Sequence, residues 1–144
     1  MLNENLKTCV ITGVTSGIGE QCALILASKG FKIIGIGRSE KRCLNTQNKI
    51  NKISNNQSFI INKCDLSDHK QIKELSKKIS SQTKKIDLLI NNAGGIFLNR
   101  ELDNQNIEMT FSVNYLSHFL LTGLLLETIL STKNSQIINV SSIA

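Results

Sequence analysis

The sequence has no proline, no tryptophan and a single tyrosine, Tyr115. Aromatic residues make up only 4% of the chain, and no Lys/Arg stripe is interleaved with them as a nucleic-acid platform would require. The net charge of +6 comes from scattered lysines. We therefore expect no nucleic-acid partner. Nucleic-acid binding through the basic surface is a weakly supported alternative.

Long apolar runs and paired cysteines are also missing. No run of about 18 apolar residues occurs, and residues 1–7 have no apolar core, so neither a membrane span nor a secretory signal is predicted. The four cysteines form no Cys-x-x-Cys pair, and the two histidines are not grouped with them, so no metal site is expected. Cys9 lies in an apolar run, which indicates a small buried side chain. A reducing, cytoplasmic location fits this cysteine usage.

Short apolar runs alternate with longer stretches of helical period along the chain. The runs predict strands at residues 8–12, 31–37, 58–64, 86–90 and 136–140. The stretches predict helices at residues 17–28, from an N-cap at Ser39 to about residue 53, after an N-cap at Ser67, and at about residues 103–130. The first helix is predicted to carry Ile18, Cys22, Ile25 and Leu26 on one side. The second runs through Leu44 and Ile50, and the third carries Ile72, Leu75 and Ile79.

This order of elements predicts an α/β fold. Strand–helix alternation implies right-handed βαβ units and a parallel sheet. The strands are apolar throughout rather than at alternate positions, as expected when helices cover both sheet faces. The predicted fold is a Rossmann-type, doubly wound parallel sheet in one domain, residues 1–144. Ligands of such sheets bind beyond the carboxyl ends of the strands.

Residues 12–19, Thr-Gly-Val-Thr-Ser-Gly-Ile-Gly, follow the first strand directly. Gly13 permits a sharp exit from the strand, Gly17 leaves room for a pyrophosphate to approach the backbone, and Gly19 lets the helix pack close to the sheet. The start of the helix then presents free N–H groups to an anion. A flexible glycine-rich loop is the alternative, but the position between a strand and a helix favours a phosphate site.

The spacing Gly-x-x-x-Gly-x-Gly, together with four later motifs in the same order, resembles the short-chain dehydrogenase/reductase family. Those motifs are Asp65-Leu66, Asn91-Asn92-Ala93-Gly94, Asn114 and Asn139-Val140-Ser141-Ser142. Residues 91–142 are similar to the retinol dehydrogenase-type branch, which does not define a substrate. The resemblance covers nearly the whole chain. It implies an oxidoreductase that transfers hydride between a nicotinamide cofactor and a carbonyl or alcohol carbon.

The end of the second strand indicates which cofactor is preferred. Enzymes that use NAD place an acidic residue there, which would repel a 2′-phosphate. This chain has Gly37 followed by Arg38, and a guanidinium can bind a phosphate bidentately. We expect NADP(H) to be preferred over NAD(H), with Ser39 and Ser16 as hydroxyl donors and Ile18 at the same turn. A solvated surface arginine at a helix start is the alternative for Arg38.

The resemblance implies five further cofactor contacts, at Asp65, Leu66, Asn92, Ala93 and Gly94. Asp65 matches the residue that binds the adenine amino group, and it could also cap a helix. Residues 92–94 match those that line the cofactor ribose, and Gly94 could also serve a tight turn. Asn91 is expected to brace neighbouring strands.

The resemblance places two catalytic residues in this chain. Ser142, rather than Ser141, matches the serine that binds the substrate oxygen. Asn114 matches the asparagine that anchors a water molecule in a proton relay, but it could equally be a polar residue in an apolar helix. The family's Tyr-x-x-x-Lys pair is missing, because Phe119 stands four residues after Tyr115. Without that pair the polypeptide lacks its general acid–base group and is predicted not to turn over.

Members of the family continue with further strands, so the resemblance implies a sheet truncated after the fifth strand. A small carbonyl or alcohol substrate and a homo-oligomer are expected for the full-length form. One side of the long apolar helix should meet the sheet, while the other resembles the family's dimer surface; core packing alone is the competing explanation. A non-catalytic NADP-binding or interaction module is the alternative function. His69 and His118 have no acidic or serine partner at triad spacing and are interpreted as structural.

Overall fold

The structure, a computed structural model, describes residues 6–53 and 59–142. Five strands form one parallel sheet in the order β3-β2-β1-β4-β5. They are β1 (Thr8–Thr12), β2 (Lys32–Gly37), β3 (Phe59–Lys63), β4 (Leu88–Asn91) and β5 (Gln136–Asn139). The chain order reverses between β1 and β4, which is the point where such sheets bind ligands.

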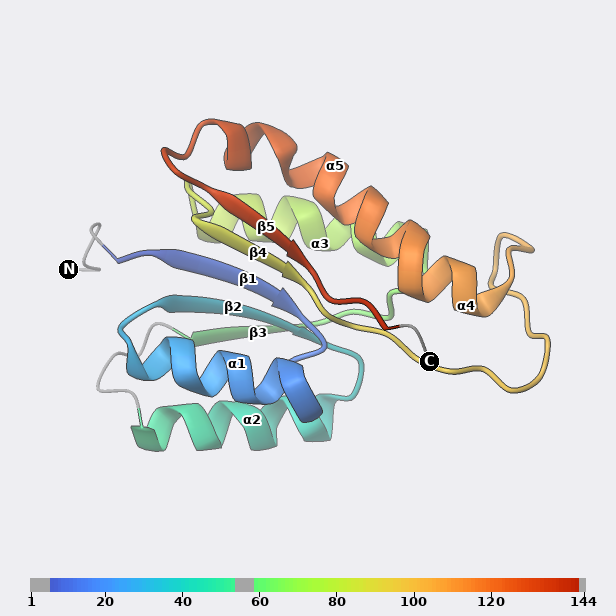
Figure 1. Ribbon diagram of the computed structural model, residues 1–144, viewed down its shortest axis with the longest axis horizontal. Coiled ribbons are helices and arrows are strands. Elements are labelled where there is room, and N and C mark those ends of the chain that lie inside the picture. The colour runs from blue at the N-terminus through green and yellow to red at the C-terminus, as the bar shows by residue number, and fades with distance from the viewer. Residues whose placement is uncertain (1–5, 54–58, 143–144) are drawn as a thin grey trace.

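Helices cover both faces of this sheet (Figure 1). They are α1 (Gly17–Ser28), α2 (Glu40–Ile53), α3 (His69–Gln82), α4 (Met109–Phe111) and α5 (Ser117–Leu130), with a π-helical segment η1 (Ser112–Leu116) joining the last two. α1 and α2 lie on one face, whereas α3 and α5 lie on the other (Figure 1). The predicted doubly wound α/β fold is confirmed.

Two apolar clusters fill the two faces, and β1 contributes to both. Val10 belongs to the cluster under α3 and α5, while Cys9 and Ile11 belong to the cluster under α1. All five residues of β1 are buried, which explains why the strand is apolar without alternation. Burial, and next the neighbouring Cys22, raise the pKa of the Cys9 thiol to about 12, consistent with the predicted small buried side chain.

The four apolar residues predicted on one side of α1 do not share one environment. Ile18 and Ile25 are 64% and 54% exposed, whereas Cys22 and Leu26 are partly buried against the core cluster. The fully buried residues are three small ones, spaced four apart: Gly19, Ala23 and Ala27. Small side chains let the helix backbone lie close to the sheet.

The remaining strands and the second helix show smaller differences. β2 begins at Lys32, β3 ends at Lys63, β4 covers Leu88–Asn91 instead of residues 86–90, and β5 ends at Asn139. Predicted strand residue 58 lies outside the described residues. In α2 the inward positions are Cys43, Thr46 and Ile50, whereas Leu44 is 59% exposed.

The long helix begins later than the predicted residue 103. Asp103 accepts hydrogen bonds from the backbone N–H groups of Gln105 (2.8 Å) and Ile107 (3.0 Å), which holds a turn instead of a helix. Helical structure starts at Met109, where the Glu108 carboxylate caps the backbone N–H groups of the first turn. The continuous helical stretch is therefore Met109–Leu130.

The cap of α3 was also predicted one residue too early. Asp68, not Ser67, accepts hydrogen bonds from the backbone N–H groups of Lys70 and Gln71. The Ser67 hydroxyl donates instead to the Asp65 carboxylate, at 2.8 Å. Serine and aspartate both suit an N-cap. Here Ser67 is held in the turn formed by Asp65, so Asp68 caps the helix.

The outer side of the long helix is apolar. Phe111, Tyr115 and Phe119 stack along it, with ring centroids 5.2 Å and 6.4 Å apart, and each is at least 50% exposed. Its inner side places Leu121 and Leu125 in the core. By length and composition alone the 22-residue stretch could cross a membrane, which is weak evidence from a single helix. The predictions of no membrane span and of self-association both stay predictions.

Candidate functional site

The turn after β1 lies at the carboxyl edge of the sheet, tight against the end of β4. Gly13 has φ +73°, and a Cβ on it would come within 2.9 Å of the Ala93 Cα atom. A Cβ on Gly19 would come within 2.2 Å of the Gly13 carbonyl oxygen and 2.3 Å of Asn92 Nδ2. The sharp exit and the close packing that the glycines predicted are both present.

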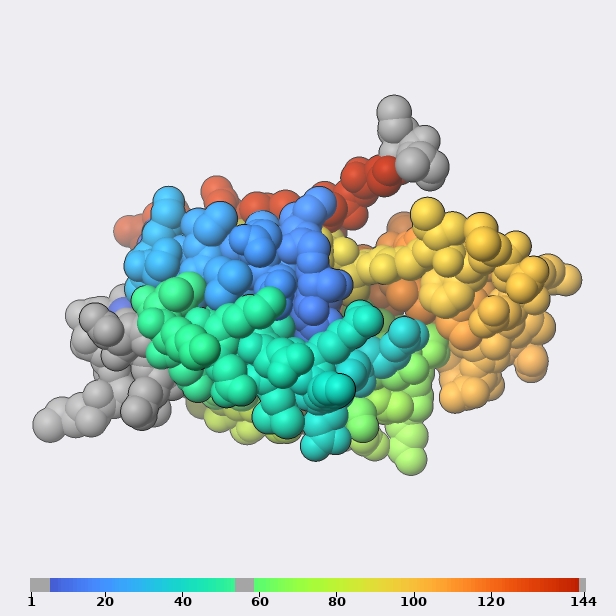
Figure 2. Space-filling view, turned by 90° about the horizontal axis from the view of Figure 1, so that it is seen from below, coloured from blue at the N-terminus to red at the C-terminus, as the bar shows by residue number. Residues whose placement is uncertain are grey.

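The N-terminus of α1 opens to solvent at this edge. Ser16 is the N-cap, but its side chain makes no capping hydrogen bond to the first turn. Gly17 has φ +54°, and a Cβ on it would meet no described heavy atom within 4 Å beyond its own neighbours. Ser16, Gly17 and Ile18 are exposed, and the segment after β4 (yellow and orange) stands out from the body formed by α1 and α2 (Figure 2). An open helix start of this kind suits an anion.

Asn92 and Thr12 tie the two central strands together beside that helix start. The Thr12 hydroxyl accepts hydrogen bonds from the backbone N–H groups of Asn92 and Ala93, both at 2.9 Å. The Asn92 amide donates to the carbonyl oxygens of Thr12 (3.0 Å) and Gly13 (3.3 Å). The Asn92 side chain therefore holds the glycine turn in place, and its predicted contact with a ribose stays a prediction.

Arg38 and Ser39 follow β2 at the same edge, and both are exposed. Gly37, just before them, is buried, and a Cβ there would come within 2.6 Å of Thr15 and 2.7 Å of Cys43. No side chain fits at Gly37, so the residues available next to the glycine turn are Arg38 and Ser39. The positive group thus stands at the strand end where a ribose-binding acid would otherwise be placed.

Asp65 and Leu66 lie beyond β3, further along the edge. The Asp65 carboxylate accepts hydrogen bonds from the Ser67 backbone N–H (3.0 Å) and hydroxyl, so it forms a turn before α3 rather than the helix cap itself. Leu66 is 8% exposed and packs in the core, leaving its backbone as the part that can face a ligand.

Asn114 lies in the π-helical segment and contacts the segment after β4. Its amide nitrogen donates to the Gly95 carbonyl oxygen and its amide oxygen accepts from the Gly95 N–H, both at 2.9 Å. The adjacent Gly94 is exposed. Asn114 is therefore not merely a polar residue in an apolar helix, because it pins the loop beside the site. Its catalytic role stays a prediction.

Ser142 lies three residues beyond the end of β5, past the same edge of the sheet. The preceding strand, β5, is joined to β4 through Asn91. The Asn91 amide donates to Asn139 Oδ1 (2.8 Å) and to the Thr122 hydroxyl on α5 (3.1 Å). The predicted bracing role of Asn91 is confirmed. Apart from Asn114, the predicted site residues therefore follow the ends of the five strands or lie at the start of α1.

The sequence did not predict the partners of the two histidines. His69 Nε2 lies 3.9 Å from Asp103 Oδ2, and the same carboxylate oxygen accepts a hydrogen bond from the Ser112 hydroxyl. Because the serine bonds the aspartate and not the histidine, this is a buried loop anchor rather than a nucleophile relay. His118 lies 3.3 Å from the Thr12 hydroxyl. Contacts between residues so far apart in sequence leave no local signal.

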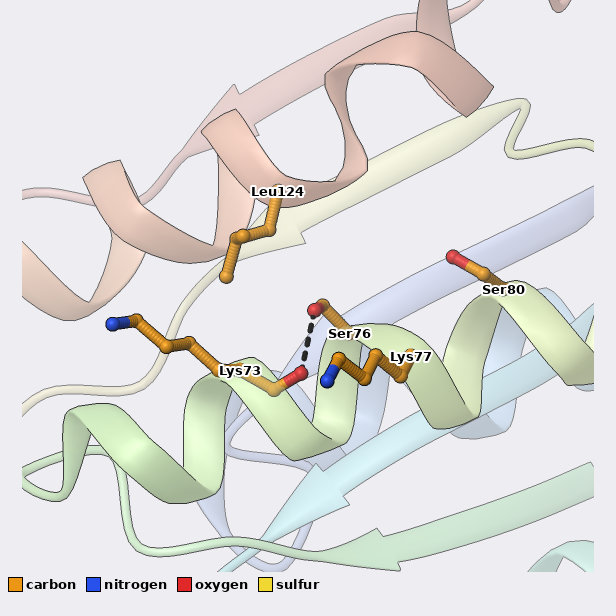
Figure 3. Close-up of a pocket in the computed structure, with 5 residues that line it drawn as sticks. All are labelled: Lys73, Ser76, Lys77, Ser80 and Leu124. Atoms are coloured by element: carbon orange, nitrogen blue, oxygen red, sulfur yellow. Dashed lines mark hydrogen bonds between the residues drawn. The ribbon is translucent and has the colours of Figure 1, made fainter.

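A shallow groove lies between α3 and α5, away from the sheet edge (Figure 3). It is lined by Lys73, Ser76, Lys77, Ser80 and Leu124. The Ser76 hydroxyl donates back to the Lys73 carbonyl oxygen at 2.8 Å. None of the predicted site residues lines it. Among the described residues, no three His, Cys, Asp or Glu side chains are grouped to hold a metal ion.

Comparison with known proteins identifies the class. A family model described as short chain dehydrogenase matches residues 7–144. The chain belongs to the short-chain dehydrogenase family, a family of oxidoreductases, as the glycine turn and its later motifs indicated.

Among its relatives are two human proteins. Retinol dehydrogenase 13 from Homo sapiens is 39% identical over 138 residues, covering 96% of this chain and 42% of that protein. Retinol dehydrogenase 11 from Homo sapiens is 37% identical over 138 residues, covering 96% of this chain and 43% of that protein. The chain thus spans about two fifths of the length of the curated relatives it matches.

Solved structures share the fold. The Pseudomonas aeruginosa RhlG/NADP active-site complex superposes with a TM-score of 0.76 at 22% identity, covering 94% of this chain and 54% of that one. The NADH-dependent reductase A1-R′ complexed with NAD gives a TM-score of 0.78 at 23% identity, covering 97% of this chain and 61% of that one. Both nicotinamide dinucleotides occur on this fold, so the fold alone does not select between them.

Proposed function

We propose that the chain binds NADP(H) across the carboxyl edge of its sheet, as the cofactor-binding part of a reductase or dehydrogenase. The observation that carries this proposal is the open start of α1, where the Ser16 side chain makes no capping hydrogen bond and a Cβ on Gly17 would meet no described heavy atom within 4 Å beyond its own neighbours. Backbone N–H groups and the positive end of the helix favour a diphosphate there. The residues present therefore fit a dinucleotide.

The remaining contacts would extend from that diphosphate in two directions. Asp65 and the Leu66 backbone would lie at the adenine end, while Ala93 and Gly94 would lie along the nicotinamide ribose. Ser142 would hold the oxygen of a carbonyl or alcohol substrate, with Asn114 keeping the neighbouring loop in place. The bound nicotinamide supplies or accepts hydride. Proton transfer to the substrate oxygen needs a separate acid–base group.

That acid–base group has no candidate within the 144-residue polypeptide. Tyr115 is its only tyrosine, lies on the outer face of the helix and stacks on Phe119. We therefore propose that this polypeptide binds the cofactor without turning it over. Binding, rather than activity, is the property on which the proposed function is tested.

The preference for NADP(H) is proposed from Arg38. Its exposed guanidinium follows β2 directly, in the place where an acid would repel a 2′-phosphate. A charge-assisted hydrogen bond of this kind contributes about 1.5–3 kcal/mol. Arg38→Ala should therefore weaken NADPH binding roughly 10- to 100-fold and change NADH binding by less than about twofold.

Isothermal titration calorimetry with NADPH and NADH tests both the binding of the cofactor and the preference for NADP(H). Lys29→Ala is the matched control, because it removes one positive charge at the opposite, C-terminal end of α1. It should leave both affinities unchanged. If the folded polypeptide binds neither nucleotide, the proposed function is wrong. If Arg38→Ala weakens both nucleotides equally, only the assigned selectivity is wrong.

A further inference from the structure

His118 lies at the start of α5, where the ring faces the last residue of β1. Its Nε2 atom is 3.3 Å from the Thr12 hydroxyl oxygen, and the Thr12 side chain is completely buried. Thr12 is the residue that immediately precedes the glycine turn. The ring therefore contacts Thr12, the residue that supports the proposed diphosphate site, without reaching the site itself.

The Thr12 hydroxyl determines which atom carries the proton in this contact. A hydroxyl has two acceptor lone pairs and one donor hydrogen. Both lone pairs are used by the backbone N–H groups of Asn92 and Ala93, each at 2.9 Å. The hydrogen is left to point at His118 Nε2, which must be an unprotonated acceptor. The ring is then neutral, with its proton on Nδ1.

The backbone of Asn114 provides a partner for that second nitrogen. Burial lowers the pKa of His118, and a hydrogen bond with the Asn114 backbone offsets part of this effect. The helical turn is widened here, because the Ser117 N–H bonds the Ser112 carbonyl five residues back. The Val113 carbonyl likewise takes its bond from a side chain, the Ser117 hydroxyl, at 2.7 Å.

We propose that His118 is a positioning residue that holds the glycine turn through the Thr12 hydroxyl. It fixes the hydroxyl that holds the ends of β1 and β4 together. The ring follows directly on the widened helical turn from which the Asn114 amide bonds Gly95. The proposal rests on the proposed function, since it concerns the same binding edge. Loss of the ring's acceptor should loosen the turn that grips the diphosphate.

Two substitutions separate the two ends of the ring. The amide of Gln reaches about as far as Nε2, so His118→Gln keeps an acceptor for Thr12. The amide of Asn reaches only as far as Nδ1, so His118→Asn keeps the contact with the Asn114 backbone and loses Thr12. We expect His118→Asn to raise the Kd for NADPH roughly tenfold, the effect of one lost hydrogen bond, and His118→Gln to raise it less than about threefold.

A second half of the experiment tests whether the two residues act through each other. In a Thr12→Val background the hydroxyl is already absent, so adding His118→Asn should cause little further loss of affinity. Losses that simply multiply would overturn the coupling. Equal affinities of His118→Asn and the wild type would overturn it as well.

The ring itself can be examined without any nucleotide. Nitrogen-15 NMR of the labelled wild-type polypeptide at neutral pH should show His118 as the neutral tautomer protonated on Nδ1. A proton on Nε2, or on both nitrogens, contradicts the inference even if every variant fails to fold. If the wild type binds no nucleotide while the tautomer is as expected, the proposed function fails and the hydrogen-bond geometry stands.

Discussion

Replacing Gly19 by alanine tests how closely α1 must approach the end of β4. A Cβ at this position would come within 2.2 Å of the Gly13 carbonyl oxygen and 2.3 Å of Asn92 Nδ2. The first of these atoms is backbone in a tight turn and cannot rotate away. The second belongs to the amide that bonds the Thr12 and Gly13 carbonyl groups. Relief therefore requires either a shift of the helix or the loss of these hydrogen bonds.

The cost can be estimated from these contacts. Overpacking a close contact costs about 1–3 kcal/mol, and each hydrogen bond lost adds about 1 kcal/mol. Alanine returns up to about 1 kcal/mol through its better helix propensity. We expect Gly19→Ala to lower the free energy of unfolding by about 1–3 kcal/mol. For a domain of this size that corresponds to a fall in Tm of roughly 3–10 °C.

Gly123→Ala is the matched control, since it makes the same substitution inside α5. A Cβ at Gly123 would meet no described heavy atom within 4 Å beyond its own helix, so alanine there should stabilise the protein by about 0.5–1 kcal/mol. Urea unfolding of both variants measures the difference. If Gly19→Ala proves as stable as Gly123→Ala, the close approach of helix and strand does not exist as described.

Three further predictions concern hydrogen bonds of carboxylates. Asp68→Ala should cost about 1 kcal/mol because α3 loses its N-cap, whereas Ser67→Ala should cost clearly less; equal losses in urea unfolding would contradict the cap at Asp68. Ser112→Ala should cost about 1–3 kcal/mol, because it removes a donor from the buried Asp103 carboxylate. Burial alone would raise the pKa of Asp103, but its hydrogen bonds and the nearby His69 hold this pKa below the usual value of about 4. This stabilisation is therefore present above about pH 4 and lost as the pH falls through the folded-state pKa, so acid unfolding of Asp103→Asn should lack that part of the slope.

Elements whose ends are marked by local chemistry could be predicted from the sequence. β1 and α1 were predicted with the bounds they have, because the glycine turn marks the end of one and the start of the other. The long helix was predicted to start too early, at Asp103, because aspartate suits a helix start as well as a turn. The structure shows the turn: Asp103 accepts hydrogen bonds from the N–H groups of Gln105 and Ile107, and these contacts are visible only in the folded loop.

The predicted apolar side of α1 is only partly right for a related reason. Ile18 and Ile25 are exposed, because the small residues Gly19, Ala23 and Ala27 face the sheet and let the two backbones approach. At the site, the parallel order of strands was enough to place the predicted residues along one edge. The contacts of His69 and His118 could not be predicted, because each joins segments separated by a helix or more along the chain.

The hydrogen bond between Asn91 and Asn139 has a consequence for the position of Ser142. A strand normally holds its alignment because sliding by one residue would turn its apolar side chains into water. All four residues of β5 are exposed, so that safeguard is weak there. The two amides face each other at the last residue of each strand, and the hydrogen bond between them opposes a register shift. A shift of β5 that this hydrogen bond failed to prevent would also move Ser142, whose hydroxyl we propose to hold the substrate oxygen.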